Sequence, residues 1–184
     1  GVQGNANSSR VGGISNDGRF VVFTSSASNL DDQATCVGGA YYVRDRRNGT
    51  TRALAAAPGG VYARFSGQEQ TPPAIQGVSH RVFYASSVPL STNFFFPANI
   101  RQIWMTDIDN GATSLVSVGS SAPANGDCLG VVLSPNGEHL SFHSGAVNLV
   151  NDGITVGGAY QLDIPCSMTA DMIGSGTPGA GGLT

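Results

Sequence analysis

The chain has 184 residues, a length that fits one domain or one part of a larger one. Only 11% of these residues are charged, and the formal net charge is −3. A surface that binds nucleic acid or anionic membranes requires a basic face, so this composition argues against both kinds of partner. No apolar run approaches the roughly 18 residues that a membrane-spanning helix needs, and we expect no membrane insertion.

A β-hairpin is predicted near the start of the chain. Asn16-Asp17-Gly18 supplies the positive φ angles of a tight turn between two stretches rich in β-formers. The second stretch, Phe20-Val21-Val22-Phe23, is apolar at consecutive positions, which predicts a strand buried on both faces. Four strands are expected in this first unit, over Arg10–Ser15, Arg19–Ser25, Ala40–Asp45 and Thr50–Ala55.

The pattern of this unit returns twice along the chain. Ile14–Phe23 resembles Leu133–Phe142, 119 residues later (133 minus 14), and Val37–Tyr41 resembles Val156–Tyr160 at the same spacing. A weaker copy, Ile75–Tyr84, lies between them. We therefore predict three units of about 60 residues, at approximately 1–60, 61–122 and 123–184.

The later units are expected to repeat the four strands of the first. The strands expected in the second unit are Thr71–Gln76, His80–Ser86, Gln102–Asp107 and Ala112–Val118. The third unit has an expected third strand over Ala159–Asp163 and a weak fourth near Met168–Ile173. No stretch has helical periodicity. Small sheets covered on both sides and repeated at a fixed period predict an all-β, β-propeller-type array of three four-stranded antiparallel blades, forming one domain over 1–184.

The motifs of the first unit resemble the blade of TolB-like, WD-type β-propellers. The motifs are Ile14-Ser-Asn-Asp-Gly-Arg-Phe-Val-Val-Phe23, Ser25-Ser-Ala-Ser-Asn-Leu30, Tyr42-Val-Arg-Asp45 and Asn48-Gly-Thr-Thr-Arg52. The resemblance implies a propeller fold, an extracellular or periplasmic location, and a role in protein recognition. Such repeats often have an Asp-Thr-Asn-Gly loop before the third strand. Asp31-Asp32-Gln33-Ala34 and Asn151-Asp152-Gly153 depart from it, so the resemblance by itself assigns no metal to these loops.

Three blades predict an incomplete ring, because propellers close with four to eight. An open stack leaves one sheet face uncovered at each end. We expect both faces to be apolar, and leaving them in water costs an appreciable part of a domain's net stability. The chain is therefore expected either to pair with a second copy as a homodimer, giving a six-bladed ring, or to be an excerpt of a longer propeller.

The most unusual local feature is an aromatic run, Phe94-Phe95-Phe96, in the long loop of the second unit. One interpretation is that the run covers the neighbouring blade. The other is that it forms an anchor for a partner chain or ligand, together with Arg101 and Trp104. Both interpretations are consistent with the sequence.

Several aspartates lie at turns and strand ends, namely Asp17, Asp45, Asp107 and Asp163. We expect them to accept hydrogen bonds from nearby backbone groups. Asp31, Asp32 and Asp152 lie in long loops that could bind calcium, although a solvated loop explains them as well; no other cofactor is expected. His139 and His143 are about 13 Å apart along one strand, too far to share a metal ion.

The three cysteines, Cys36, Cys128 and Cys166, follow no metal-binding spacing. One disulfide with a free thiol and three buried thiols are both consistent with the sequence. The cysteine content therefore says little about the redox compartment.

No Ser-His-Asp arrangement and no pair of catalytic carboxylates is recognisable in the sequence. We therefore expect no enzyme, but a non-catalytic protein-recognition or assembly module. Two alternatives remain: a carbohydrate-binding, lectin-like propeller, and an accessory domain of a secreted hydrolase.

Overall fold

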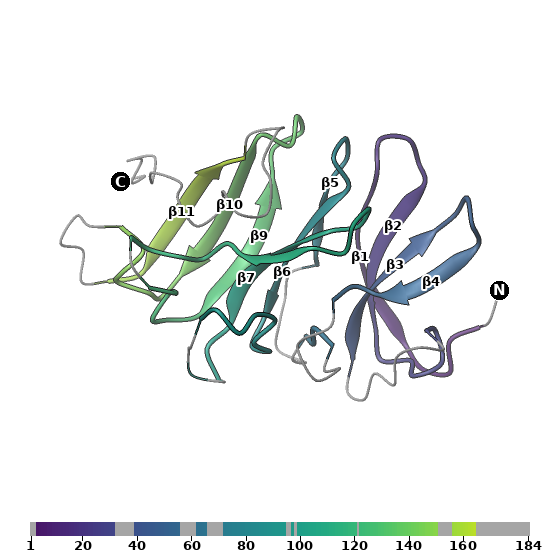
Figure 1. Ribbon diagram of the computed structural model, residues 1–184, viewed down its shortest axis with the longest axis horizontal. Coiled ribbons are helices and arrows are strands. Elements are labelled where there is room, and N and C mark those ends of the chain that lie inside the picture. The colour runs from purple at the N-terminus through teal and green to yellow at the C-terminus, as the bar shows by residue number, and fades with distance from the viewer. Residues whose placement is uncertain are drawn as a thin grey trace.

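The computed structural model describes residues 3–31, 39–55, 62–65, 72–94, 97, 99–120, 122–150 and 156–164. These residues form eleven β-strands and no helix, which confirms the predicted all-β class. The strands make three antiparallel sheets that lie side by side across the molecule in chain order (Figure 1). Within the described parts of the chain there is no helix long and apolar enough to cross a membrane.

Each sheet is built from consecutive strands. The first contains β1 (Ser8–Ile14), β2 (Phe20–Ser25), β3 (Ala40–Asp45) and β4 (Thr50–Ala53), in that spatial order. The second contains β5 (Ala74–Gln76), β6 (Arg81–Ser86), β7 (Gln102–Asp107) and β8 (Thr113–Leu115). The third contains β9 (Cys128–Leu133), β10 (His139–Ser144) and β11 (Gly158–Asp163), with β10 in the middle. The fourth strand expected near Met168–Ile173 lies outside the described residues.

Tight turns join the first two strands of every sheet. Gly18 and Gly137 adopt φ angles of 69° and 73°, in the left-handed region that disfavours a side chain. The second sheet lacks a glycine at the equivalent position, and His80 is left-handed instead, with φ of 52°. The hairpin with the weakest turn signal therefore forms with a strained histidine backbone.

The sheets pack face to face. Each sheet has a forward face, directed toward the sheet that follows it in the chain, and a rear face on the opposite side. Phe20 and Val22 on the forward face of the first sheet pack in one core with Val82, Tyr84 and Trp104 of the second sheet's rear face. The second core repeats this arrangement with Phe83, Ile103 and Met105 from the second sheet and Leu140 and Phe142 from the third. The middle sheet is therefore covered on both sides, and β6 is buried at every position.

The first strands of the three sheets lie next to one another, β1 beside β5 and β5 beside β9. Each is the edge strand of its own sheet, so we call them the inner strands. Glycine permits this approach, because a Cβ atom on Gly12 would lie 2.0 Å from the carbonyl oxygen of Pro73. A Cβ atom on Gly77 would lie equally close to Asn16 Oδ1.

The third strand of the third sheet departs from the 119-residue repeat by one residue. Tyr160 pairs with Phe142 in the ladder, as Tyr42 pairs with Phe23. The two ring pairs are stacked alike, with centroids 5.6 and 5.7 Å apart. Tyr160 therefore occupies the place of Tyr42, not of Tyr41 as the sequence match indicates. The tyrosine-to-aspartate spacing on the strand is kept, and the preceding loop is one residue shorter.

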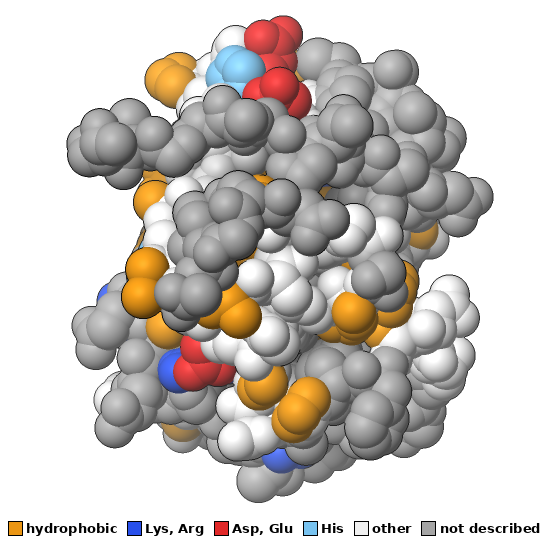
Figure 2. All heavy atoms as spheres, turned by 90° about the vertical axis from the view of Figure 1, so that its left-hand side faces the viewer, with side chains coloured by type: hydrophobic (Ala, Val, Ile, Leu, Met, Phe, Trp, Pro, Cys, Tyr) orange, Lys and Arg blue, Asp and Glu red, His pale blue; other side chains and the backbone are white. Residues whose placement is uncertain are grey.

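The expectation that both end faces are apolar is wrong for the third sheet. On β10, buried and exposed positions alternate, and His139, Ser141 and His143 are the exposed ones on the forward face. On this side of the molecule apolar side chains form only small, separate groups among polar ones in the described part (Figure 2). The rear face of the first sheet differs, because Val21 and Phe23 are half-buried there. The two ends of the stack are therefore unlike.

We predict that Gly12→Ala destabilises the fold by about 1–3 kcal/mol, because the new methyl group would overlap the Pro73 backbone. Chemical denaturation followed by circular dichroism measures the change. Gly145→Ala is the matched control, since nothing lies within 4 Å of a Cβ atom built there. Equal stability of the two variants would contradict the close approach of β1 and β5.

Candidate functional site

The inner strands and the turns after them enclose an open cavity of about 360 Å³, here called the central cavity. All three sheets contribute equivalent segments to its wall. Its apolar lining is formed by Ile14, Ile75, Val78, Val132 and Leu133. Val78 and Val132 are 74% and 61% exposed, unusually high fractions for large apolar side chains. The cavity is therefore an open surface that presents both apolar side chains and polar groups to a ligand.

The polar groups of the central cavity are uncharged. Asn16, Ser134 and Asn136 supply amides and a hydroxyl, and none of the described residues that line the cavity is ionisable. Neighbouring turns are linked by hydrogen bonds: Asn16 N donates to Gly77 O at 3.0 Å, and Gln76 Nε2 donates to Gly137 O at 2.7 Å. Such a lining can bind apolar groups and a few hydrogen-bonding groups, but it offers no acid, base or nucleophile with a perturbed pKa.

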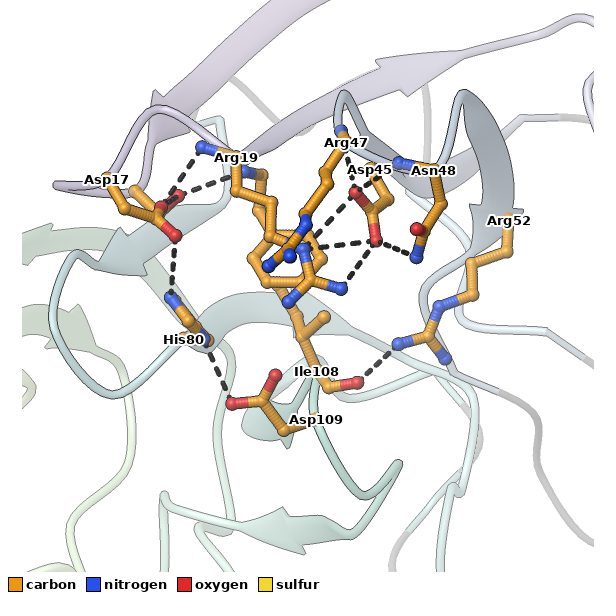
Figure 3. Close-up of polar contacts among 11 residues, drawn as sticks. Asp17, Arg19, Asp45, Arg47, Asn48, Arg52, His80, Ile108 and Asp109 are labelled. Carbon is orange, nitrogen blue, oxygen red and sulfur yellow. Dashed lines mark hydrogen bonds and ion pairs between the residues drawn. The ribbon is translucent and has the colours of Figure 1, made fainter.

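A polar cluster lies at the turn ends of the first and second sheets, next to the central cavity (Figure 3). Arg19 Nη2 donates to Asp45 Oδ2 at 2.8 Å, and its Nε lies within 3.3 Å of both carboxylate oxygens. Asp45 Oδ1 also accepts from the backbone N–H groups of Arg47 and Asn48, at 2.9 and 3.1 Å. The Arg19 guanidinium lies 4.4 Å from the centre of the Phe20 ring. Asp45 thus holds β2, β3 and the following turn together.

His80 connects the two sheets within this cluster. Its Nδ1 lies 2.9 Å from Asp109 Oδ2 in its own sheet, and its Nε2 lies 3.9 Å from Asp17 Oδ2 in the first sheet. The ring packs edge-on against Phe20, with centroids 4.8 Å apart. Arg52 of the first sheet donates to the Ile108 carbonyl of the second. These contacts cross-link the sheets, which accounts for the cluster without a catalytic role.

The electrostatics of the cluster agree with a structural role. The hydrogen bond from Arg19 lowers the pKa of Asp45 from its ordinary 3.8 to about 2. The pKa of Asp17 is also lowered, first by the hydrogen bond from the Ser15 hydroxyl and then by the Arg19 backbone N–H. Both carboxylates are therefore held in the charged form, whereas a general acid requires a raised pKa.

The rear face of the first sheet forms a second hollow, of about 490 Å³. Val11, Val21 and Phe23 are its apolar residues. Arg10, Arg44 and Arg46 surround them, and no acidic side chain is among the described residues that line the hollow. Closer to the β2–β3 loop the same face is covered by the chain itself, where Leu30 and Tyr62 pack against Tyr42. The open part is therefore basic with an apolar floor.

The structure places two residues of the predicted aromatic anchor in the first core. Trp104 is fully buried and Phe94 is partly buried against the first core. Arg101 donates to Asp127 through both its backbone N–H and its Nη2, at 2.8 and 2.6 Å. Phe95 and Phe96 lie outside the described residues. Trp104 thus belongs to the interior, and partner binding by the phenylalanine run stays a prediction.

Three of the four turn aspartates accept the expected backbone hydrogen bonds. Asp17, Asp45 and Asp107 each accept from the backbone N–H group two residues later in the chain. Asp163 Oδ1 lies 2.8 Å from His139 Nδ1 on the neighbouring strand. In the loops, Asp31 Oδ2 accepts from Ala53 N at 2.7 Å, while Asp32 and Asp152 lie outside the described residues. No group of three His, Cys, Asp or Glu side chains suited to a metal ion occurs in the described part of the chain.

Among the cysteines, the structure describes Cys128, which is a free, buried thiol. Burial raises its pKa to about 11, so it stays protonated at neutral pH and is a poor nucleophile. Cys36 and Cys166 lie outside the described residues, and their pairing stays open.

Sequence reasoning missed the central cavity and a repeated asparagine contact. Asn5 N donates to Asn29 Oδ1 at 2.9 Å, and Asn125 N donates to Asn148 Oδ1 at the same distance. The match of Asn29-Leu30 with Asn148-Leu149 was the signal for this contact. The glycine pair at 12–13 and the proline pair at 72–73 were the signals for the cavity. The glycines have no side chain, so the two segments can lie close together in the wall of the cavity.

Comparison with known proteins gives no family for the chain. No protein-family model matches it, and no curated protein matches it significantly. Function therefore has to be argued from the geometry.

We predict that Asp45→Asn lowers the melting temperature at pH 7, because Asn keeps the acceptor oxygen but loses the charge that pairs with Arg19. A lowered folded-state pKa stabilises the fold above the unfolded pKa. The difference from the unmodified chain should therefore shrink as the pH falls from 3.8 to about 2. Thermal melts at a series of pH values measure it. Arg19→Gln should reproduce the loss, and the double variant should lose little more. Additive losses would show that the two side chains are not coupled.

Proposed function

We propose that the chain is a non-catalytic recognition or assembly module of the β-propeller type, which binds a protein segment at the central cavity. The observation that supports this most is the cavity itself. Three repeated sheets bring their inner strands together around an open, uncharged surface in which apolar side chains are mixed with amide, hydroxyl and backbone groups. A surface of this kind provides hydrophobic contact area and hydrogen bonds, which are what a recognition site needs.

The packing of the sheets supports the propeller interpretation. In both internal contacts a forward face packs on a rear face, and the first strand of each sheet lies innermost. A propeller is generated by repeating this relation around a central channel. An extracellular or periplasmic location is the setting that the family resemblance implies.

A carbohydrate-binding function has less support. Lectins commonly bind sugars on exposed aromatic platforms, and the single tryptophan of the chain, Trp104, is fully buried. A neutral cavity that combines exposed valines with hydrogen-bonding groups suits a peptide segment, which has both apolar side chains and backbone amides.

Selection of a displayed random-peptide library against the chain tests the proposal. We expect apolar peptides that bind at least about tenfold more weakly to Val78→Asp and to Val132→Asp, because each change places a charge in the cavity. Val156→Asp is the control, since Val156 is 69% exposed and does not line the cavity. Peptides that bind all three variants equally, or a selection that yields no binder, would refute the assignment. A glycan array run in parallel tests the carbohydrate alternative.

A further inference from the structure

Two sheet faces have no neighbouring sheet among the described residues: the rear face of the first sheet and the forward face of the third. Both contacts between sheets in the described part of the chain join a forward face to a rear face. The two open faces are likewise one rear face and one forward face, so they are of the kinds that pack together within the chain. A second copy of the chain would offer each face the kind of surface that it lacks.

The charges at the two ends are complementary. Arg10, Arg44 and Arg46 surround the hollow on the rear face of the first sheet. The sequence from Pro123 to Ile164 contains no Lys or Arg, and Glu138 and Asp163 lie at the turn end of the third sheet. A head-to-tail contact would therefore place acidic groups against basic ones, which favours association and defines the orientation.

The repeat indicates which side chains would meet. The backbone N–H after each third strand donates to Arg19 O, His80 O and Glu138 O in the three sheets, so these residues are equivalent. Arg47 and Asp109 are equivalent as well, since each donates its N–H to the carboxylate two residues before it. Across the first and second sheets, His80 packs against the ring of Phe20, which follows Arg19, and binds Asp109, so Asp109 lies near the turn that contains Arg19. In the same arrangement between the third sheet of one copy and the first sheet of another, Glu138 takes the place of Arg19 and Arg47 takes the place of Asp109. The acidic and the basic residue are then on opposite sides of the contact from those within the chain.

We propose that two copies of the chain associate head to tail, with the forward face of the third sheet of each copy against the rear face of the first sheet of the other. Both contacts form at once, related by a two-fold axis, and together they close six sheets into a ring. This inference rests on the assembly part of the proposed function and names its partner. Since His139, Ser141 and His143 are polar, the contact depends more on charge than the internal cores do, and salt weakens it.

Sedimentation equilibrium at low ionic strength tests the pairing. We expect a reversible shift from the 18.8 kDa monomer to a dimer as concentration rises, and a shift back toward monomer when salt is added. A stable monomer at every concentration would overturn the proposal. The peptide selection on the central cavity does not require dimers, so the two proposals can fail separately.

Charge exchange identifies the faces. Arg47→Glu and Glu138→Arg each create like-charge contacts in both interfaces of a homodimer, and each variant alone should associate at least about tenfold more weakly. An equimolar mixture of the two variants restores opposite charges at both interfaces and should form a heterodimer. Arg64→Glu is the control, because Arg64 is exposed and lies on neither face. Both altered side chains are exposed, so melting temperatures measured at concentrations where the unmodified chain is monomeric should stay unchanged. Homodimers that persist in the single variants, or no recovery in the mixture, would exclude this contact.

Discussion

The close approach of the inner strands is the constraint on which the rest of the structure depends. β1 and β5 can lie side by side because Gly12 and Gly77 have no Cβ atom, which would overlap Pro73 and Asn16; β9 lies on the other side of β5. Once these strands are in contact, the sheets that extend from them must face one another. Both hydrophobic cores follow from that geometry, since each is formed where a forward face meets a rear face. The central cavity is the part of the approach that side chains leave open.

Polar residues in this molecule mainly cross-link its parts. The Arg19–Asp45 pair holds the strands and turn of the first sheet, and His80 links the first and second sheets at the same end. Asp17 and Asp45 have lowered pKa values because they accept hydrogen bonds, which keeps them charged at neutral pH. The buried thiol of Cys128 has the opposite shift and is equally unreactive. The charged side chains at these positions stabilise the fold, whereas the central cavity is lined by uncharged residues.

The two ends of the stack differ in polarity. The forward-face positions of β2 and β6 are buried, whereas those of β10, His139, Ser141 and His143, are exposed. A polar face can stay in water without a large cost, so the stack can end there. The arginines around Val21 and Phe23 likewise keep the opposite face soluble while leaving an apolar floor. Such surfaces suit a reversible contact better than a permanent core.

The sequence by itself determined the all-β class, the three-fold repeat and the turns, because Asn-Gly and Asp-Gly signals and consecutive apolar residues act locally. The roles of Asp17, Asp45 and Asp107 were predictable for the same reason, since their partners lie within three residues. Only the tertiary structure decided that Trp104 is buried, that Tyr160 occupies in the third sheet the position that Tyr42 has in the first, and that the forward face of the third sheet is polar. These outcomes depend on which sheet faces which and on the register between distant strands. The contacts that a side chain makes with another repeat cannot be inferred from the residues next to it in the sequence.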